Sequence, residues 1–253
     1  MALREAFARP LEPESPAVAH AARLNGRLAN WRTQALLDEL IHREFPGEIA
    51  LVSSFGAESV VLLHLVASVD RTVPVVFIDT GKIFGSTLRY RDEIAARLGL
   101  KDVRVARPDA GMLAKGDSDS SLWLSEPDKC CAIRKVAPLA RALSGFDAWI
   151  SGRKRFQGGL RTALPLMEAD GDRVKVNPLS DWTKEDIAAY RRLHDLPEHP
   201  LVADGFRSIG CMPCTTRVAD GEDERDGRWR GRDKTECGIH LGLAPFETDG
   251  SGI

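Results

Sequence analysis

The first 150 residues alternate short apolar runs with segments of helical spacing, and this alternation restricts the fold more than any other feature. The apolar runs cover 49–53, 73–79, 103–106 and 148–151. Between them, apolar residues recur at helical spacing, most clearly across 58–69 and 84–98. Strands that are apolar on both faces are typical of parallel sheets covered by helices. We therefore predict an α/β fold, with an open, mostly parallel twisted sheet flanked by helices.

The regular pattern weakens towards both ends of the chain, which suggests three parts. The 253 residues are enough for one large domain or two small ones. Residues 1–30 are rich in Ala, Arg and Pro without a clear period, so we expect a loosely packed lead-in that ends in helix. An α/β domain is expected over 31–215, and an irregular C-terminal segment over 216–253.

Within the α/β domain, the sequence predicts further elements with a weaker pattern. We expect helices over 31–45, 129–143 and 184–194, and a short strand over 174–176. The stretch 108–128 is rich in Asp, Ser and Gly and is expected to be irregular.

Charge and composition exclude several classes of protein. The formal net charge of −2 gives no overall field that would attract nucleic acid or an anionic membrane. The N-terminal residues carry early acids and no apolar core of a signal peptide, and the longest apolar runs are too short to cross a bilayer. We expect a cytoplasmic protein with no membrane or nucleic-acid partner. The oligomeric state stays open, with a homo-oligomer among the alternatives.

Polar side chains follow the first two apolar runs at the ends of the expected strands. Ser53, Ser54 and Ser59 surround Gly56 after the first run, and Asp79 and Thr80 follow the second. Ligands of open parallel sheets bind beside the carboxyl ends of strands, where helix N-termini present free N–H groups. The first segment lacks the lysine of a Walker loop, so kinase-like chemistry is not indicated. A Gly-containing turn that binds nothing is the alternative.

Four of the five cysteines form two close pairs. Cys130 and Cys131 are adjacent, and Cys211 and Cys214 form a CxxC about 80 residues later. In a reducing compartment, an odd number of cysteines does not indicate a disulfide framework. Four thiolates suit an iron–sulfur cluster or Zn²⁺, although an adjacent Cys-Cys pair is unusual in zinc ribbons. Unlinked buried thiols are the third alternative.

The fifth cysteine, Cys237, lies in a polar, Gly-rich segment where we expect an exposed and mobile thiol. Lys234 and His240 are near enough in sequence to favour its thiolate, which makes Cys237 a candidate nucleophile. An incidental surface cysteine is the alternative. Arg153 and Arg161 follow the fourth strand, a position where guanidinium groups can bind phosphate or sulfate oxygens.

Several of these segments together resemble a known family. SSFGAES, FIDTGKIF, KCCAIRKVAPL, ISGRKRFQGG, GCMPC and KTECGIH occur in this order and are similar to motifs of the APS/PAPS (adenylylsulfate/phosphoadenylylsulfate) reductase family. The resemblance extends from about residue 31 to residue 242. The loop at Ser53 also resembles the SGGxDS-like phosphate loop of the adenine nucleotide alpha-hydrolase-like group, which implies a Rossmann-like sheet.

The resemblance implies an oxidoreductase of sulfate assimilation and cysteine biosynthesis. APS would be reduced to sulfite and AMP through a Cys237 S-sulfonate, with thioredoxin or a glutaredoxin-like protein as reductant and His240 as a helper. Cys130, Cys131, Cys211 and Cys214 would hold a [4Fe–4S] cluster. The residues expected to bind substrate by motif match are Ser53, Ser54, Phe55, Ser59, Asp79, Thr80, Lys135, Arg161, Arg225 and Arg228.

Three alternatives remain. Relatives that keep all four of these cysteines generally resemble APS reductases, but PAPS use or dual use stays open. An ATP-dependent enzyme such as a tRNA thiolation enzyme is less favoured, because the loop lacks a full SGGxDS sequence. A zinc-dependent interaction module without enzymatic activity is the third.

Overall fold

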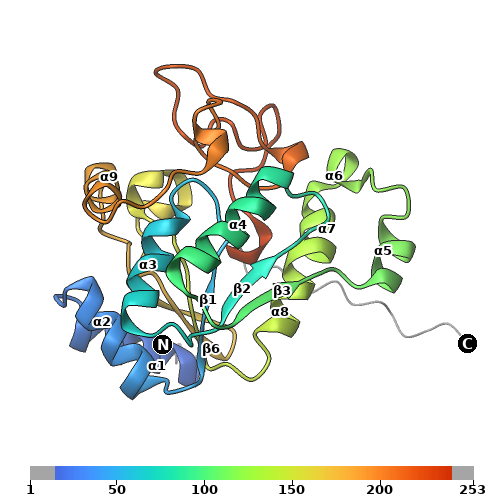
Figure 1. The fold of residues 1–253 in the computed structure, drawn as a ribbon. Helices are drawn as coiled ribbons and strands as arrows, with labels where there is room; N and C mark the ends of the chain where they lie inside the picture. The colour runs from blue at the N-terminus through green and yellow to red at the C-terminus, as the bar shows by residue number, and fades with distance from the viewer. Residues whose placement is uncertain (1–14, 241–253) are drawn as a thin grey trace, which may run out of the picture.

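A six-stranded sheet forms the centre of the computed structural model, which describes residues 15–240 (Figure 1). The strand order is β3-β2-β1-β4-β6-β5, and every pairing is parallel except that of β5 with β6. The strands are β1 (Ile49–Val52), β2 (Val75–Ile78), β3 (Val103–Ala106), β4 (Ala148–Ile150), β5 (Met167–Asp170) and β6 (Arg173–Val176). The predicted α/β fold with a mostly parallel sheet is confirmed.

Helices connect the strands and continue into short helical turns near the C-terminus. The α-helices are α1 (Pro16–Leu28), α2 (Thr33–Glu39), α3 (Ser59–Val69), α4 (Gly85–Leu98), α5 (Ala110–Gly116), α6 (Leu122–Ser125), α7 (Pro127–Cys131), α8 (Ala137–Ala142) and α9 (Lys184–Leu193). Two π-helical segments, η1 (Leu40–Glu44) and η2 (Ala132–Val136), extend α2 and join α7 to α8. The 3-10 turns are η3 (Arg155–Gln157), η4 (Gly159–Arg161), η5 (Pro200–Val202), η6 (Met212–Cys214) and η7 (Gly238–His240).

Both faces of the sheet are covered, which explains the continuously apolar strands. Ile49 and Leu51 of β1 pack into a large core with α1 to α4 and α9. Ala50, between them, faces the opposite side, where it packs with Trp149 and with Leu139 of α8. Alternate residues of a strand point to opposite faces, so a strand buried on both sides must be apolar throughout.

The order of the strands reverses beside β1. The chain runs from β1 to β2 and β3 on one side and then returns to place β4 on the other side of β1. The helical connections on the two sides therefore diverge at the carboxyl ends of β1 and β4, which leaves a crevice typical of ligand sites in open parallel sheets.

The structure corrects three expectations for the less regular segments. The stretch 108–128 contains α5 and α6, and the Asp109 side chain caps α5 by accepting from the backbone N–H of Met112 at 2.9 Å. The hairpin β5–β6 turns at Gly171 and adds a strand that we did not expect. Leu24 and Leu28 of α1 are fully buried in the main core, so residues 15–28 are packed rather than loose.

The predicted C-terminal segment is folded as far as residue 240. It crosses the carboxyl end of the sheet in turns and ends in η7, and the bridge between Ile83 and Cys211 joins the preceding segment to the loop after β2. The remaining residues of this segment, and the first part of the predicted lead-in, lie outside the described residues. No helix between residues 15 and 240 is long and apolar enough to cross a membrane.

Candidate active site

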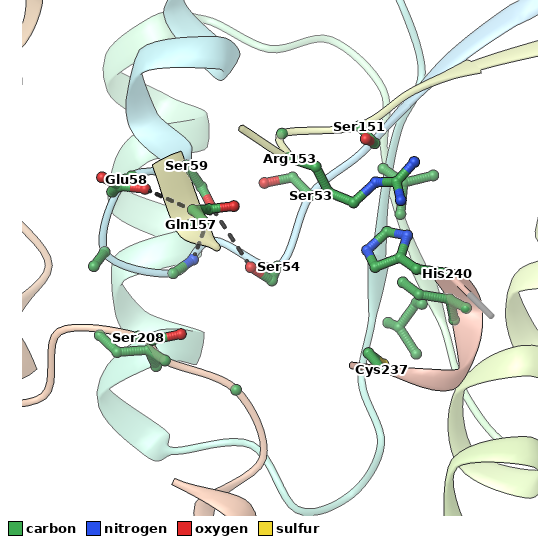
Figure 2. Close-up of a pocket in the computed structure, with 18 of the residues that line it drawn as sticks. Ser53, Ser54, Glu58, Ser59, Ser151, Arg153, Gln157, Ser208, Cys237 and His240 are labelled. Carbon is green, nitrogen blue, oxygen red and sulfur yellow. Dashed lines mark hydrogen bonds between the residues drawn. The ribbon is translucent and has the colours of Figure 1, made fainter. Parts of the chain in front are cut away.

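A pocket lies at the carboxyl ends of β1 and β4, where the strand order reverses. Its walls come from the loop after β1, from η2, from the loop after β4 and from the segments 207–211 and 224–240. Figure 2 shows Ser54 and Ser59 on one wall and Cys237 and His240 on the opposite wall. The pocket therefore brings together residues from most of the length of the chain.

The loop after β1 contributes three of its predicted hydroxyl groups to the pocket, those of Ser53, Ser54 and Ser59. The loop is closed by its own hydrogen bonds. The Ser53 hydroxyl accepts from the backbone N–H of Phe55 at 3.2 Å, and the Ser59 hydroxyl accepts from that of Gly56 at 3.0 Å. A Cβ on Gly56 would come within 3.1 Å of the Ile209 carbonyl, so glycine allows the loop to approach the segment opposite.

Phe55 does not line the pocket, which corrects the prediction for this residue. Its ring is fully buried and contacts the ring of Phe77 edge to face, with centroids 5.7 Å apart. The backbone of Phe55 has a φ of 48°, a region that bulky residues rarely adopt. This conformation accompanies burial of the side chain in the core, while the serines on either side line the pocket.

Of the two polar residues after β2, only Thr80 lines the pocket. Its buried hydroxyl lies 3.2 Å from Cys211 Sγ. Asp79 instead accepts a hydrogen bond from the backbone N–H of Gly81 at 3.1 Å and pairs with Arg107 at 3.1 Å. The predicted role of Asp79 in the pocket is therefore corrected.

All four predicted cations, Lys135, Arg161, Arg225 and Arg228, line the pocket. Arg161 binds both carboxylate oxygens of Glu236, at 2.6 and 2.8 Å. Arg228 donates to the Cys214 carbonyl at 3.2 Å, and its guanidinium stacks over the Trp229 ring with a separation of 4.4 Å. These contacts hold Arg161 and Arg228 in place beside the cavity.

Cys237 is half-buried on one wall of the pocket, so the expectation of an exposed thiol is corrected. The Lys135 ammonium lies 3.5 Å from Cys237 Sγ. A hydrogen bond from the Cys131 thiol and the charge of Lys135 hold the pKa of Cys237 below its usual value, although burial opposes this effect. A thiolate at this position can act as a nucleophile.

The other four cysteines are all free thiols, and three of them are buried. Burial raises the pKa of Cys130 to about 11, and the nearby Cys211 and Cys214 add to this rise. These three thiols therefore lie within electrostatic range of one another, while Cys131 contacts Cys237. Across residues 15–240, no group of three or more His, Cys, Asp or Glu residues is arranged to hold a single metal ion.

His240 is in the pocket as predicted, but in an environment that keeps it neutral. Burial, together with the charges of Lys175, Arg153 and other nearby cations, holds the pKa of His240 well below its usual value. Its ring is stacked on that of Trp149, with centroids 6.1 Å apart. Within the described part of the chain, Nδ1 of His240 and Nε of Arg153 are the buried side-chain atoms without a hydrogen-bond partner. Figure 2 shows both side chains on the same side of the pocket.

Several pocket residues were missed by sequence reasoning. The β4 side supplies Ser151, Lys154 and Gln157, and the C-terminal segment 216–240, called the tail from here on, supplies Glu236. Lys154 pairs with Glu58 at 2.7 Å and so joins the loop after β4 to the start of α3. A signal for Glu236 was available, because an acid directly precedes the candidate nucleophile, but its partner Arg161 lies 75 residues away.

Comparison with known proteins gives matches over most of the chain. Residues 48–217 match the phosphoadenosine phosphosulfate reductase domain. A Mesorhizobium japonicum protein named adenosine 5'-phosphosulfate reductase is 49% identical, with 96% of this chain and 98% of the relative covered. A Chelativorans protein of the same name is 50% identical over 92% and 94% of the two chains. The crystal structure of phosphoadenylyl-sulfate reductase from Candida auris is similar, with a TM-score of 0.66, 26% identity and coverage of 83% and 100%.

Proposed function

The chain belongs to the phosphoadenosine phosphosulfate reductase family, and we propose that it reduces adenosine 5'-phosphosulfate (APS) to sulfite and AMP in sulfate assimilation. The observation that carries the proposal is the position of Cys237 in the pocket, with its thiol beside the Lys135 ammonium and near Arg225 and Arg228. A cationic pocket with one nucleophilic thiol suits a substrate whose reacting group is an anionic sulfuryl.

In the first step, the Cys237 thiolate attacks the sulfur of the sulfuryl group. The bond between this sulfur and the bridging oxygen breaks, and AMP leaves with the electron pair. The product is a Cys237 S-sulfonate. Lys135, Arg225 and Arg228 would stabilise the charge on the leaving phosphate and on the transferred group.

In the second step, a thiolate of an external dithiol, thioredoxin or a glutaredoxin-like protein, attacks Cys237 Sγ. Sulfite leaves with the electron pair of the sulfur–sulfur bond, and a mixed disulfide remains. The second thiol of the reductant then attacks the reductant sulfur that is bonded to Cys237. This step closes a disulfide within the reductant and releases the Cys237 thiolate. The reductant supplies both electrons and ends as a disulfide, so no second cysteine of this chain is required.

The serine loop after β1 is proposed to hold the nucleotide. Ser53, Ser54 and Ser59 lie across the pocket from Cys237, and Thr80 lines the same pocket with its hydroxyl 3.2 Å from Cys211 Sγ. A nucleotide bound along this loop would point its phosphosulfate towards Cys237. His240, neutral and with a free Nδ1, can accept or donate one proton near the reacting group.

We also propose that Cys130, Cys131, Cys211 and Cys214 hold a [4Fe–4S] cluster. Their donor set is purely thiol, and three of the four are buried. A cluster core is larger than one ion, so its thiolates lie farther apart than those of a zinc site. When bound, the group would supply charge and rigidity beside the pocket.

Lys135 is the residue through which these cysteines would affect the pocket. The charges of Cys211, Cys237 and Cys131 raise the pKa of Lys135, against the effect of its burial. The ammonium therefore stays charged between the cysteine pairs and the nucleophile, where it can bind substrate oxygens and keep Cys237 ionised.

Sulfite release from APS tests the proposed function. With thioredoxin and its reductase present, we expect sulfite and AMP to be released from APS. Sulfite release from PAPS should be slower, because the substrate that we propose lacks a 3'-phosphate. Similar kcat/KM values for the two nucleotides would indicate a dual reductase. No sulfite from either nucleotide would contradict the proposal, and pyrophosphate release from ATP in the same preparation would favour an alpha-hydrolase-like reaction.

Gly210→Ala is expected to lower kcat/KM for APS by about 10- to 100-fold, because a misplaced positioning group has large effects on rate. A Cβ on Gly210 would overlap the Arg228 guanidinium, which must then leave its place in the pocket. Gly26→Ala is the matched control, since a Cβ there meets nothing within 4 Å and Gly26 lies in α1, far from the site. An unchanged kcat/KM in Gly210→Ala would show that Arg228 is not needed where it lies.

A further inference from the structure

The tail is attached on both sides of the pocket, and the two attachments differ in kind. On the side of α7 and η2, Lys234 pairs with Asp128, and Cys237 contacts Cys131 and Lys135. On the other side, of these three tail residues, Glu236 makes the contact, with Arg161 of η4. The residue next to the nucleophile thus joins the tail to the opposite wall.

The Glu236 carboxylate has the geometry of a strong ion pair. Oε2 accepts from Arg161 Nε at 2.6 Å, and Oε1 accepts from Arg161 Nη2 at 2.8 Å. Oε1 also lies 3.4 Å from Arg225 Nη2 and accepts from the backbone N–H of Cys237 at 2.8 Å. Glu236 is only 5% exposed. A bidentate, buried pair of this kind fixes both side chains in one orientation.

Arg161 is itself held in place. It donates to the Gln157 side chain, and Gln157 is bound to Glu58 at 3.1 Å. Glu58 also pairs with Lys154 at 2.7 Å. Hydrogen bonds therefore run from the start of α3 through the loop after β4 to the residue beside Cys237. The tail is anchored to a rigid part of the fold at this point.

We infer that Glu236 is a positioning residue, whose pairing with Arg161 holds the tail across the pocket and fixes Cys237 for attack. The inference rests on the proposed function for the reaction that Cys237 carries out. That the Glu236–Arg161 pair fixes the position of Cys237 does not depend on the proposed function. Glu236 touches the backbone N–H of Cys237, so a displacement of the carboxylate moves the nucleophile directly. Glu236 itself makes no bond in the reaction.

The pair persists over the working pH range. Burial alone would raise the pKa of Glu236, but the hydrogen bonds and charges of Arg161 and Arg225 lower it from 4.5 to about 2. A carboxyl with a lowered pKa contributes stability above its usual value and loses it only as the pH falls towards the lowered one. The Glu236 carboxylate therefore has to be neutralised by a substitution and not by a change of pH.

The test compares Glu236→Gln with the wild-type full-length protein, purified without oxygen and with neither nucleotide nor reductant added. Alkylation of Cys237 is followed with iodoacetamide and with a bulky polyethylene-glycol maleimide, and the modified peptide after Lys234 is quantified by mass spectrometry. A change in thiolate fraction alters both rates by a similar factor, whereas displacement of the tail favours the bulky reagent. We expect the bulky reagent to react about tenfold faster in the variant, as loss of a charge-assisted bond implies.

Three further variants make the result specific. Glu222→Gln removes a carboxylate of the same tail that pairs with Arg230 outside the pocket, and it should leave both rates unchanged. The double variant Arg161→Gln, Glu236→Gln should react no faster than either single variant, since both changes remove the same interaction between Arg161 and Glu236. Glu236→Asp keeps the charge on a shorter side chain and should give an intermediate rate. If Glu236→Gln loses its thermal unfolding transition, Glu236→Asp takes its place in the comparison with the wild type.

Equal rates of bulky alkylation in wild type, Glu236→Gln and Glu236→Asp would overturn the inference, as would an equal increase in Glu222→Gln. Because the measurement uses no APS, it stands apart from the proposed function. Failure to release sulfite from APS would contradict that function and leave the alkylation result intact. Where APS is reduced, Glu236→Gln should lower kcat, calculated per folded protein from the thermal unfolding transition, more than it changes KM.

Discussion

Replacement of Cys237 by serine is expected to abolish sulfite release from APS, with a loss of at least ~1000-fold. A serine hydroxyl stays protonated under conditions in which the cysteine is ionised beside Lys135, so it cannot attack sulfur at a comparable rate. The adduct should disappear with the activity. Mass spectrometry after mixing the protein with APS alone should find an S-sulfonate on Cys237 of the wild type and none in Cys237→Ser.

The serine variant separates the nucleophile from the rest of the pocket. Serine is nearly isosteric with cysteine, and the walls contributed by Ser54, Ser59 and Arg228 are unchanged. AMP should therefore bind Cys237→Ser and wild type with similar affinity, measured by calorimetry, and the two proteins should unfold at similar temperatures. Full activity in the variant would contradict the assignment of Cys237 and would require another residue to carry the sulfuryl group.

The second large effect is expected from Cys131→Ser, which should lose iron, acid-labile sulfide and visible colour together with at least ~100-fold of the activity. A serine alkoxide is a poor substitute for a thiolate ligand, and a partly ligated cluster is lost readily. Metal and sulfide are measured on protein purified without oxygen, so the readout does not depend on turnover. Zinc in place of iron, in colourless wild-type protein, would contradict the cluster.

Cys214→Ser is the matched control for Cys131→Ser. Cys131 contacts Cys237 directly, whereas the pKa of Cys214 is raised by burial and by the charge of Cys211. If the four cysteines hold one cluster, both variants should lose iron and activity. If Cys131 acts only through Cys237, then Cys131→Ser should lose activity and keep its iron, whereas Cys214→Ser should still lose iron.

The sheet was predictable because burial on two faces leaves a direct record in the sequence. Runs such as 49–53 and 148–151 are apolar at every position, and their order fixed the parallel core. The edge strand β5 was missed because it reads Met-Glu-Ala-Asp, with only one residue fully buried. Its signal lay in the turn instead, where Gly171 sits between two acids, a short hairpin signature.

The site was predictable where chemistry and strand ends coincide, and less so where backbone conformation decides. Ser53 and Thr80 follow strands and do line the pocket. Phe55 and Asp79 lie beside them in sequence but face elsewhere, one because of a positive φ and the other because Arg107 binds it. The Arg161–Glu236 pair joins residues 75 positions apart, so no local pattern reveals it.

The cations around His240 show a further limit of local reasoning. Lys175 is buried beneath Trp149, with its ammonium 4.8 Å from the ring centre, and burial together with Arg153 lowers the pKa of Lys175 to about 7. In the sequence, Lys175 reads as one polar residue of a short strand. Its proximity to the pocket arises only when β6 pairs with β4.

The pocket is closed by contacts between residues far apart in the chain, and this has a consequence for how the protein matures. Lys135 and Cys237 are 102 positions apart, and all six strands precede Cys237. Because domains fold as their residues emerge during synthesis, the sheet can form before the reactive thiol has been added to the chain. The nascent protein can therefore carry its folded sheet before the nucleophilic thiol of Cys237 is added, and this thiol meets Lys135 on a surface that is already built.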